Sequence, residues 1–397
     1  NTKVPQGNAD KNGIGDFFYA PPTNFLALCS KNLPDPAIDP NNNEQPQDYF
    51  GSLTYTGNGS DGRSIVDSEA SVDGTVNFTP NWVWIKDRGQ QNNHVWVDSV
   101  RGVDSVIFSN SATPVASGAT QVSSFNDGGF TNGTGQTYVN VNTHSYIAWN
   151  WKAGGTAVSN TEGDVTSSVS ASTEAGLSIV TYTATGSGDI TVGHGLGVAP
   201  EMIIGKVKNQ SYDWRIFALL AGATNQLGFS NAAAAGGVSF GATAPTSTVF
   251  TAGRGGTDNM NFGAGDQVVA YCFASKEGYS KVGLYVGNAS STNGTDVFTG
   301  FRPAWVMIKS VEGGTGHWNI YDNARQTFTP NQQSFNPNQQ IIRADLDAVE
   351  NNTSGSTIAI DFLANGFKSR STHVNVGSRV YVYLAFAEQP FKYANAK

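Results

Sequence analysis

The charged residues with the most suggestive spacing are two Asp-x-x-Arg pairs. Asp98 stands three residues before Arg101, and Asp322 stands three residues before Arg325. A carboxylate held beside a guanidinium could serve in acid–base catalysis. However, each pair follows a Trp-containing apolar segment at a matching place in the chain, so the pair belongs to a repeated pattern and not to one site. We therefore expect two ion pairs that anchor loops.

The sequence has no His-Glu-x-x-His motif and no P-loop. The strings Gly-x-Gly-x-x-Gly at 57–62 and Gly-x-Ser-x-Gly at 237–241 occur, but no amphipathic helix pattern follows either, so we find neither a dinucleotide-binding fingerprint nor a nucleophile elbow. The Gly-His-Gly-Leu-Gly segment at 193–197 precedes Pro200 and no helix follows it, so we interpret it as a turn. A glycosidase needs two carboxylates about 5–10 Å apart, and the sparse acidic residues do not single out such a pair. We predict a protein that is not an enzyme, with no catalytic residues and no cofactor.

The residue types that bind metals are scattered along the chain. The two cysteines are Cys29 and Cys272, and neither they nor the five histidines follow a zinc-binding spacing. The Asx-Gly segments at 58–62 and 126–128 offer oxygen ligands for calcium, but such segments are also common hairpin turns. We expect turns, no metal site, and two unpaired thiols, with Cys272 in the buried strand at 268–273.

Carbohydrate is the ligand class that the composition favours. The chain has 8 Trp and 14 Tyr, whose rings can stack on sugars, and many Asn side chains that can bind hydroxyl groups. Most of the Trp stand in apolar segments, however, so we assign them to the core. The predicted core residues are Trp82, Trp84, Trp96, Trp149, Trp305, Trp318 and Tyr271. A sugar would then contact loops outside the repeats, where the candidates are Tyr212, Arg254, Asn259 and His317.

The chain contains three similar copies of one segment. Each copy begins with a short β-rich run and a Gly/Asn turn, continues with a Pro, an apolar strand and a Lys, and then has a Trp-bearing strand and an Ala-containing strand. The copies begin at Tyr55, Tyr182 and Tyr285. The tripeptide Phe-Ser-Asn at 108–110 recurs at 229–231, which supports the alignment of the copies.

The repeated Lys follows the main apolar strand of each copy. Its three occurrences are Lys86, Lys206 and Lys309. We expect each Lys to mark the point where its strand leaves the core, with the aliphatic stem lying along apolar surface.

The pattern of the strands predicts an all-β fold. Strands such as the one at 82–85 are apolar at both parities, so both of their faces must be covered. Gly/Asn/Pro turns without intervening amphipathic helices favour tandem antiparallel β-sandwiches of the jelly-roll or concanavalin-like kind. The predicted organisation is an extended N-terminal arm (1–45), three sandwich repeats (46–155, 176–278 and 279–397) and a linker or edge strand (156–175).

Composition excludes several other classes of protein. Glycine is frequent (46 of 397 residues), only 14% of the residues are charged, and the formal net charge is −8. Coiled coils need many more charges, and disordered chains have fewer apolar residues than the 39% found here. No apolar run reaches the roughly 18–20 residues of a membrane span. An acidic chain also lacks the basic surface of a nucleic-acid binder, so we expect neither membrane insertion nor nucleic-acid binding.

The repeated motifs resemble a family of uncharacterised repeat domains from virion structural proteins, often tail fibres, of marine and cyanobacterial tailed phages. The resemblance covers essentially the whole chain, and it is most specific at 147–155, 192–203 and 385–393. The segment at 15–34 resembles the end of a preceding SPRY-like sandwich, most of which would lie outside this sequence. Copy two departs from the pattern, because Met202 replaces the strand Trp and the Asp-x-x-Arg pair is missing.

The resemblance implies a non-enzymatic virion protein on the exterior of the particle, at the tail or the capsid surface. We expect a tail fibre or receptor-binding module that contacts other virion proteins, forms a homo-oligomer with a trimer as the first expectation, and binds a host surface glycan. A capsid-decorating or head-fibre protein is a close alternative. A carbohydrate-binding adhesin and a capsule depolymerase are the alternatives from other classes.

Overall fold

The computed structural model of the chain describes residues 4–117, 120–134, 136–218, 225–229, 235–236, 239–254, 260–312, 316–325, 336, 338–352 and 359–394. It is 41% strand and 3% helix, with several antiparallel sheets, so the predicted all-β sandwich fold is confirmed. The described helices are single 3₁₀ turns, and none of them has the length and hydropathy that a membrane span requires.

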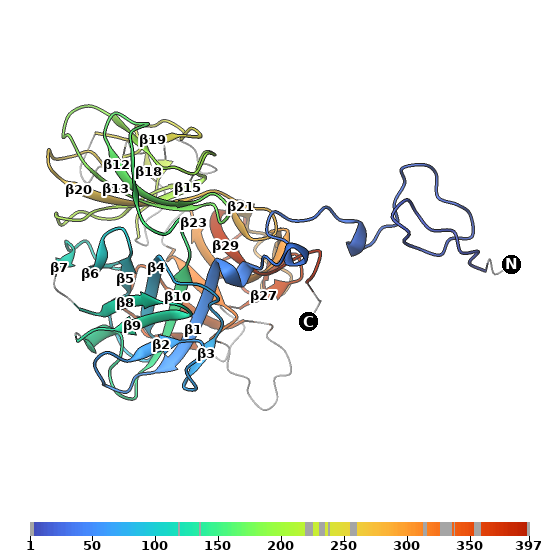
Figure 1. Ribbon diagram of the computed structural model, residues 1–397, viewed down its shortest axis with the longest axis horizontal. Coiled ribbons are helices and arrows are strands. Elements are labelled where there is room, and N and C mark those ends of the chain that lie inside the picture. The colour runs from blue at the N-terminus through green and yellow to red at the C-terminus, as the bar shows by residue number, and fades with distance from the viewer. Residues whose placement is uncertain are drawn as a thin grey trace.

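The first unit is a sandwich of a large and a small antiparallel sheet (Figure 1). Its strands are β1 (Phe50–Thr56), β2 (Ser64–Val66), β3 (Val72–Gly74), β4 (Trp82–Asp87), β5 (Val95–Asp98), β6 (Gly102–Phe108), β7 (Ala116–Ser117), β8 (Val122–Asn126), β9 (Gly129–Asn132) and β10 (Ser145–Trp151). The large sheet has the order β3-β1-β10-β4-β5-β6-β7, and the small sheet has the order β2-β9-β8. A 3₁₀ turn, η4 (Gln136–Tyr138), precedes β10.

The second unit has the same plan. Its strands are β11 (Val158–Asn160), β12 (Ser167–Ser172), β13 (Leu177–Thr183), β14 (Ile190–Gly193), β15 (Met202–Val207), β16 (Arg215–Ala218), β17 (Asn225–Gln226), β18 (Ala235–Gly236), β19 (Val249–Ala252) and β20 (Gln267–Phe273). The large sheet has the order β11-β12-β13-β20-β15-β16, and β14 pairs with β19. The segment at 156–175 therefore supplies two strands, β11 and β12, at the edge of this sheet.

The third unit closes the series. Its strands are β21 (Ser280–Val286), β22 (Asp296–Phe298), β23 (Phe301–Ser310), β24 (Asn319–Asp322), β25 (Gln340–Arg343), β26 (Asn351–Asn352), β27 (Ile360–Leu363), β28 (Gly366–Ser369) and β29 (Val380–Pro390). The large sheet has the order β21-β29-β23-β24-β25-β26, and the small sheet has the order β22-β28-β27. The series β1-β10-β4-β5, β13-β20-β15-β16 and β21-β29-β23-β24 are topologically identical, so the three copies share one fold.

Strand register corrects one detail of the sequence alignment. Trp96 pairs with Ile107 in the first unit, and Ile216 pairs with Leu227 in the second. Phe108 therefore corresponds to Gly228 and not to Phe229, so the expected equivalence of 108–110 with 229–231 is wrong by one residue.

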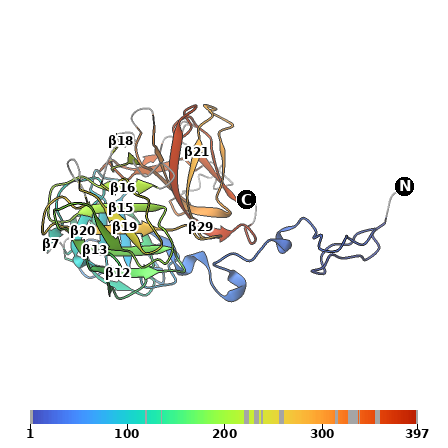
Figure 2. The same ribbon diagram turned by 90° about the horizontal axis from the view of Figure 1, so that it is seen from above.

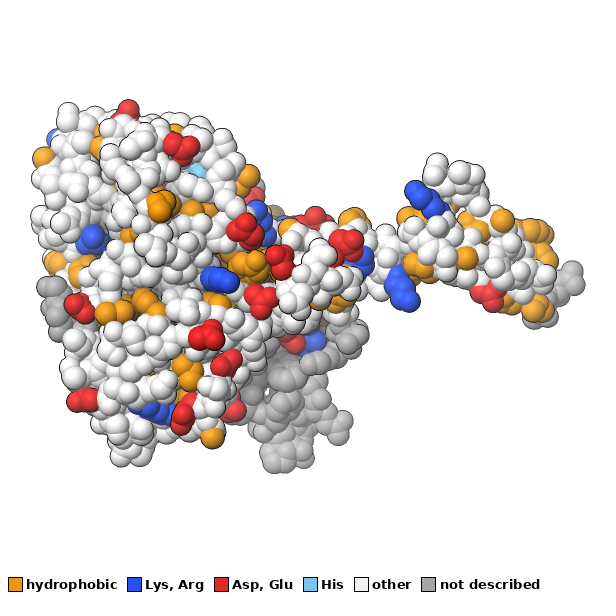
Figure 3. Space-filling view, in the orientation of Figure 1, with side chains coloured by type: hydrophobic (Ala, Val, Ile, Leu, Met, Phe, Trp, Pro, Cys, Tyr) orange, Lys and Arg blue, Asp and Glu red, His pale blue; other side chains and the backbone are white. Residues whose placement is uncertain are grey.

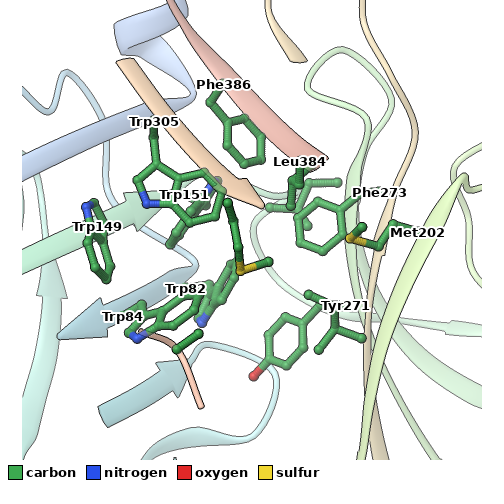
Figure 4. Packing of buried hydrophobic residues seen from close by; sticks show 14 of the residues in the cluster. Trp82, Trp84, Trp149, Trp151, Met202, Tyr271, Phe273, Trp305, Leu384 and Phe386 are labelled. Atoms are coloured by element: carbon green, nitrogen blue, oxygen red, sulfur yellow. The ribbon is translucent and has the colours of Figure 1, made fainter. Parts of the chain in front are cut away.

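The three large sheets pack against one another around a central core. Within each sandwich, a separate apolar cluster lies between the large and the small sheet. The opposite faces of the large sheets share one further cluster, which contains all eight tryptophans of the chain. Figure 4 shows part of this cluster. Because neighbouring residues of a strand point to opposite faces, Trp82 and Trp84 enter this central core while Val83 and Ile85 enter the sandwich of the first unit.

The N-terminal residues form an arm that projects from the body of three sandwiches (Figures 1 and 2). The arm contains the 3₁₀ turns η1 (Ser30–Asn32), η2 (Pro40–Asn42) and η3 (Pro46–Asp48). Near its tip the buried Asp10 carboxylate accepts hydrogen bonds from the backbone N–H groups of residues 12, 14 and 27 and from the Asn32 amide. These bonds, which lower the pKa of Asp10 to about 2 against the opposing effect of its desolvation, give the tip a local fold.

Candidate functional site

Both Asp-x-x-Arg pairs form buried ion pairs. The distance between Arg101 Nε and Asp98 Oδ2 is 2.5 Å, the distance between Arg325 Nε and Asp322 Oδ2 is 2.6 Å, and all four side chains are fully buried. The predicted ion pairs are therefore present. Each aspartate also accepts hydrogen bonds from backbone N–H groups of the loop that follows it, so each pair fixes its loop and has no open face for a substrate.

The same pairs join neighbouring units. The Tyr271 hydroxyl of the second unit donates to Asp98 of the first at 2.6 Å. The Trp149 indole N–H of the first unit donates to Asp322 of the third at 3.0 Å. Burial opposes the charge of Arg325, but the carboxylates of Asp322 and Glu350 raise its pKa above the usual value.

Strand register identifies the equivalent residues at the third junction. One position of the central strand (β10, β20 or β29) is filled by Trp149, Tyr271 and Leu384 in the three units. One position of the strand two places away in the same sheet (β5, β16 or β24) is filled by Asp98, Ala218 and Asp322. The junction between the third and second units therefore has Leu384 and Ala218 where the others have a hydrogen bond. Both residues are buried in the central core, so this junction replaces both polar partners by apolar ones, an exchange that can cost little free energy.

A second set of contacts also joins each unit to a neighbouring one. The Trp214 indole N–H of the second unit donates to the carbonyl of Phe108 in the first at 2.9 Å. The Trp318 indole N–H of the third unit donates to the carbonyl of Gly228 in the second at 2.7 Å. In the first unit the equivalent residue is His94, whose Nε2 lies 3.0 Å from the Leu346 carbonyl of the third. Every unit thus binds the next one in a closed ring of three.

The repeated lysines do not lie where the sequence predicted. Lys86, Lys206 and Lys309 are fully buried, so the expectation that their stems lie along the surface is wrong. The Lys86 ammonium donates to the carbonyls of Asp87, Gln90 and Asp347, at 2.7, 3.1 and 3.1 Å. Desolvation lowers the pKa of Lys86 and of Lys309 to about 8 in each case.

Two of these lysines also cross a junction. The acceptor Asp347 belongs to the third unit, and Lys206 of the second unit donates to the Ala112 carbonyl of the first at 2.8 Å. Carbonyl groups that face a buried ammonium satisfy its donors. Lys86 and Lys206 therefore link neighbouring units, whereas Lys309 donates to the Gly316 carbonyl of its own unit.

The glycine-rich segment at 193–197 is a turn with a buried histidine. His194 Nε2 lies 3.1 Å from the Thr246 carbonyl, and its Nδ1 accepts from the Leu196 N–H at 3.2 Å. Burial lowers the pKa of His194. Both ring nitrogens are thus engaged in local structure.

The Asx-Gly segment at 126–128 forms the turn between β8 and β9, and the one at 58–62 is held by a buried asparagine and not by clustered carboxylates. In the first unit Asn140 accepts from the Asn58 N–H and donates to the Asn58 side chain. Asn375 makes the same pair of bonds with Asn288 in the third unit. No group of three or more His, Cys, Asp or Glu side chains suited to a metal occurs among the described residues. Both cysteines are unpaired, and Cys272 is buried.

The predicted core residues all lie in the central core. Trp82, Trp84, Trp96, Trp149, Trp305, Trp318 and Tyr271 are each no more than 1% exposed. They pack between the three sandwiches and not inside any one of them. The sequence pattern predicts their burial but does not distinguish these two locations.

The predicted glycan contacts are not brought together. Tyr212 is half-buried against Phe262, with ring centroids 5.4 Å apart, and its carbonyl accepts from Lys206. Arg254 is exposed beside Asp189, which accepts its backbone N–H. His317 Nδ1 lies 2.7 Å from Asp345 Oδ2 in the third unit. Asn259 lies outside the described residues.

An open groove at the junction of the first and second units is the better candidate site. It has a volume of about 980 Å³ and lies between the end of the first unit and the β12 edge of the second. The half-buried Tyr49 and Phe125 line it, together with the exposed Asp127 and Glu174 and the buried Phe78 beneath them. The Lys152 ammonium lies 5.4 Å from the centroid of the Tyr49 ring.

The chemistry of this groove fits a carbohydrate. Aromatic rings offer apolar platforms, and carboxylates and amides offer acceptors and donors for hydroxyl groups. Sequence reasoning missed these residues because they come from segments that lie far apart in the chain. One sequence feature could have pointed to the groove: most of the residues that line it fall in the segments between the repeated strands.

A comparison with protein families identifies the family of the chain. A family model described as "Domain of unknown function (DUF7483)" matches residues 45–390, so the chain belongs to this family. No curated protein and no solved structure matches the chain.

Proposed function

We propose that this member of the DUF7483 family is a non-enzymatic structural protein on the exterior of a tailed-phage virion, where it serves as a tail fibre or receptor-binding module. The observation that carries the proposal is the division of the chain into a body of three docked sandwiches and a projecting arm with exposed apolar side chains. In the body, the conspicuous charged and aromatic residues hold the three sandwiches together. Such a body can present loops and grooves to a binding partner.

The arm supplies a surface for attachment to other virion proteins. Seven of the thirteen exposed large apolar side chains among the described residues lie between residues 4 and 28. They are Val4, Phe17, Phe18, Tyr19, Phe25, Leu26 and Leu28. Apolar side chains concentrated on so short a segment are typical of a surface that is covered in an assembly.

The groove between the first two units is the proposed contact with a host surface glycan. Its aromatic and carboxylate lining supports this role, and all of its lining residues lie between 49 and 174, outside the tip of the arm. The same groove favours a second candidate function, that of a carbohydrate-binding adhesin outside a virion. We propose a homotrimer as the assembled form, since closed symmetric assemblies dominate among homo-oligomers; light scattering on the full chain measures this state.

Location on particles tests the proposal. Immunogold labelling or cryo-electron microscopy of purified virions should place the protein on the exterior, and its position at the tail or the capsid distinguishes a tail fibre from a capsid-decorating or head-fibre protein. The double variant Phe25→Asp/Leu28→Asp should lose incorporation into particles, whereas Val158→Asp, an exposed apolar position on the body, should retain it. Absence of the wild-type protein from purified particles would contradict the proposal.

Two further assays separate the alternatives. A glycan array with binding that depends on the groove, together with absence from particles, would favour the adhesin. Sustained release of reducing ends from host polysaccharide, lost on replacing Asp127 or Glu174, would instead identify a depolymerase.

A further inference from the structure

A second hollow lies where the arm meets the third unit. Its volume is about 330 Å³. The arm contributes Leu33, Pro34 and Pro36 to its wall, and the third unit contributes Phe298 at the end of β22 and Pro390 at the end of β29. Charged side chains of both signs gather around this part of the surface (Figure 3).

Two lysines in this hollow have no carboxylate to balance them. Lys276 and Lys281 are half-buried, and neither forms an ion pair with any described residue. A third lysine of the hollow, Lys392, differs because it pairs with Asp35 of the arm. The only carboxylate of the lining is Glu277, which is exposed. With the Lys392–Asp35 pair taken as neutral, Lys276, Lys281 and Glu277 leave one positive charge in excess, in a chain with a net charge of −8. The hollow is therefore locally favourable for an anion.

An exposed aromatic ring stands beside these charges. Phe298 is 59% exposed, and the Lys281 ammonium lies 5.6 Å from the centroid of its ring. The cation and the exposed ring together suit a ligand that has an anionic group and an apolar face.

We propose that this hollow binds a carboxylated sugar, the hexuronate unit of an acidic polysaccharide. The carboxylate would lie at Lys276 and Lys281, and the C–H face of the pyranose ring would lie on Phe298. Charge complementarity selects this occupant over a neutral sugar, and the Phe298 and Pro390 surface selects it over a small inorganic anion. The hollow is separate from the groove between the first two units, and its occupation does not depend on where the protein is located.

Calorimetric titration of the full chain with methyl glucuronoside and with methyl glucoside tests the proposal. The glucuronoside should bind on the order of tenfold more tightly, and added salt should weaken its binding. Lys281→Gln and Phe298→Ala should each weaken glucuronoside binding by about tenfold, whereas Lys31→Gln, an exposed arm lysine outside the hollow, should bind as the wild type does. An unchanged denaturation midpoint shows that each variant is folded.

Three results would overturn the proposal. Equal binding of the two glycosides would exclude recognition of the carboxylate. Binding of inorganic phosphate as tight as that of the glucuronoside would show a site for charge alone. Undiminished binding by Lys281→Gln would place the sugar elsewhere. None of these results bears on the presence of the protein in virions.

Discussion

The hydroxyl group of Tyr271 donates a hydrogen bond to Oδ2 of Asp98 across the junction of the second and first units, at 2.6 Å. The same carboxylate oxygen lies 2.5 Å from Nε of Arg101. One buried oxygen therefore holds together a loop of its own unit and the central strand of the next. The third junction has the apolar residues Leu384 and Ala218 at the equivalent positions. Substitution of the polar residues by these apolar ones therefore measures how much the contact between Tyr271 and Asp98 contributes to stability.

Removing the aspartate should destabilise the whole protein. Asp98→Ala leaves the Arg101 guanidinium buried without its carboxylate, and breaking a buried pair in this way typically costs about 3–5 kcal/mol. The free energy of unfolding, followed by tryptophan fluorescence in urea, measures this loss. The triple variant Asp98→Ala/Arg101→Met/Tyr271→Leu, which reproduces the apolar pair Ala218 and Leu384 of the third junction, should recover part of it, because neither a guanidinium nor a phenol is left buried without the carboxylate. The backbone N–H groups of residues 100 and 101 still lose their acceptor in this variant. A triple variant as unstable as the single one would contradict this account.

Loss of a central tryptophan should weaken all three units together. The Trp305 ring is fully buried, with its centroid 5.8 Å from those of Trp151 and Phe386 and 6.2 Å from that of Trp149. Trp305→Ala should cost about 3–5 kcal/mol, as large-to-small core substitutions do. Because the core is shared, calorimetry should show one unfolding transition at a lower temperature, and Leu28→Ala in the exposed arm should leave it unmoved. Separate transitions for the units would show that they unfold independently.

Acid should destabilise the protein in a window that His373 helps to set. Burial of this ring, together with the positive charges of Arg343 and His317, lowers its pKa to about 4 from an ordinary value of 6.5. The unfolded chain therefore binds a proton more readily than the folded one between these values. The stability linked to His373 is therefore complete above pH 6.5 and decreases as the pH falls toward 4. We expect His373 to account for about 1–2 kcal/mol of this decrease, allowing for its partial exposure. His373→Asn should have a shallower dependence of the urea midpoint on pH, and an unchanged slope would show that the histidine takes no part.

The buried Lys86 should have a signature at alkaline pH. Because burial lowers its pKa to about 8 from 10.5, the folded protein releases this proton before the unfolded chain does. Stability linked to Lys86 is therefore gained as the pH rises through this interval. Relative to Lys86→Met, the wild type should gain about 1–2 kcal/mol between pH 7.5 and 9.5. Lys31→Met, on the exposed arm, supplies the control, and a constant difference between wild type and Lys86→Met would mean that the ammonium is solvated.

The repeated pattern was sufficient to predict three sandwiches, because strand periodicity and turn residues are local properties of the sequence. It also indicated that a strand such as β4 is covered on both faces. It did not indicate what covers the second face, since that depends on how three distant segments dock. The same limit explains the groove, whose lining comes from residues between 49 and 174.

The burial of Lys86, Lys206 and Lys309 also depends on how distant segments dock, so the sequence did not predict it. A Lys at the end of an apolar strand usually reaches water, and only the carbonyls of a neighbouring unit, such as that of Asp347, make its burial tolerable. The buried asparagines had a sequence signal that could have been found. Asn-Val followed by Tyr five positions later occurs at Asn140 and again at Asn375, and in both copies the Tyr hydroxyl accepts the Val N–H.

Because a single polypeptide supplies all three members of the ring, its closure is a unimolecular event. Dilution cannot separate the members, as it can separate the subunits of a noncovalent trimer. A substitution in one copy also leaves the equivalent residues of the other two copies unchanged. The pair Leu384 and Ala218 illustrates this freedom, since a homotrimer would have to accept such a change at all three junctions at once.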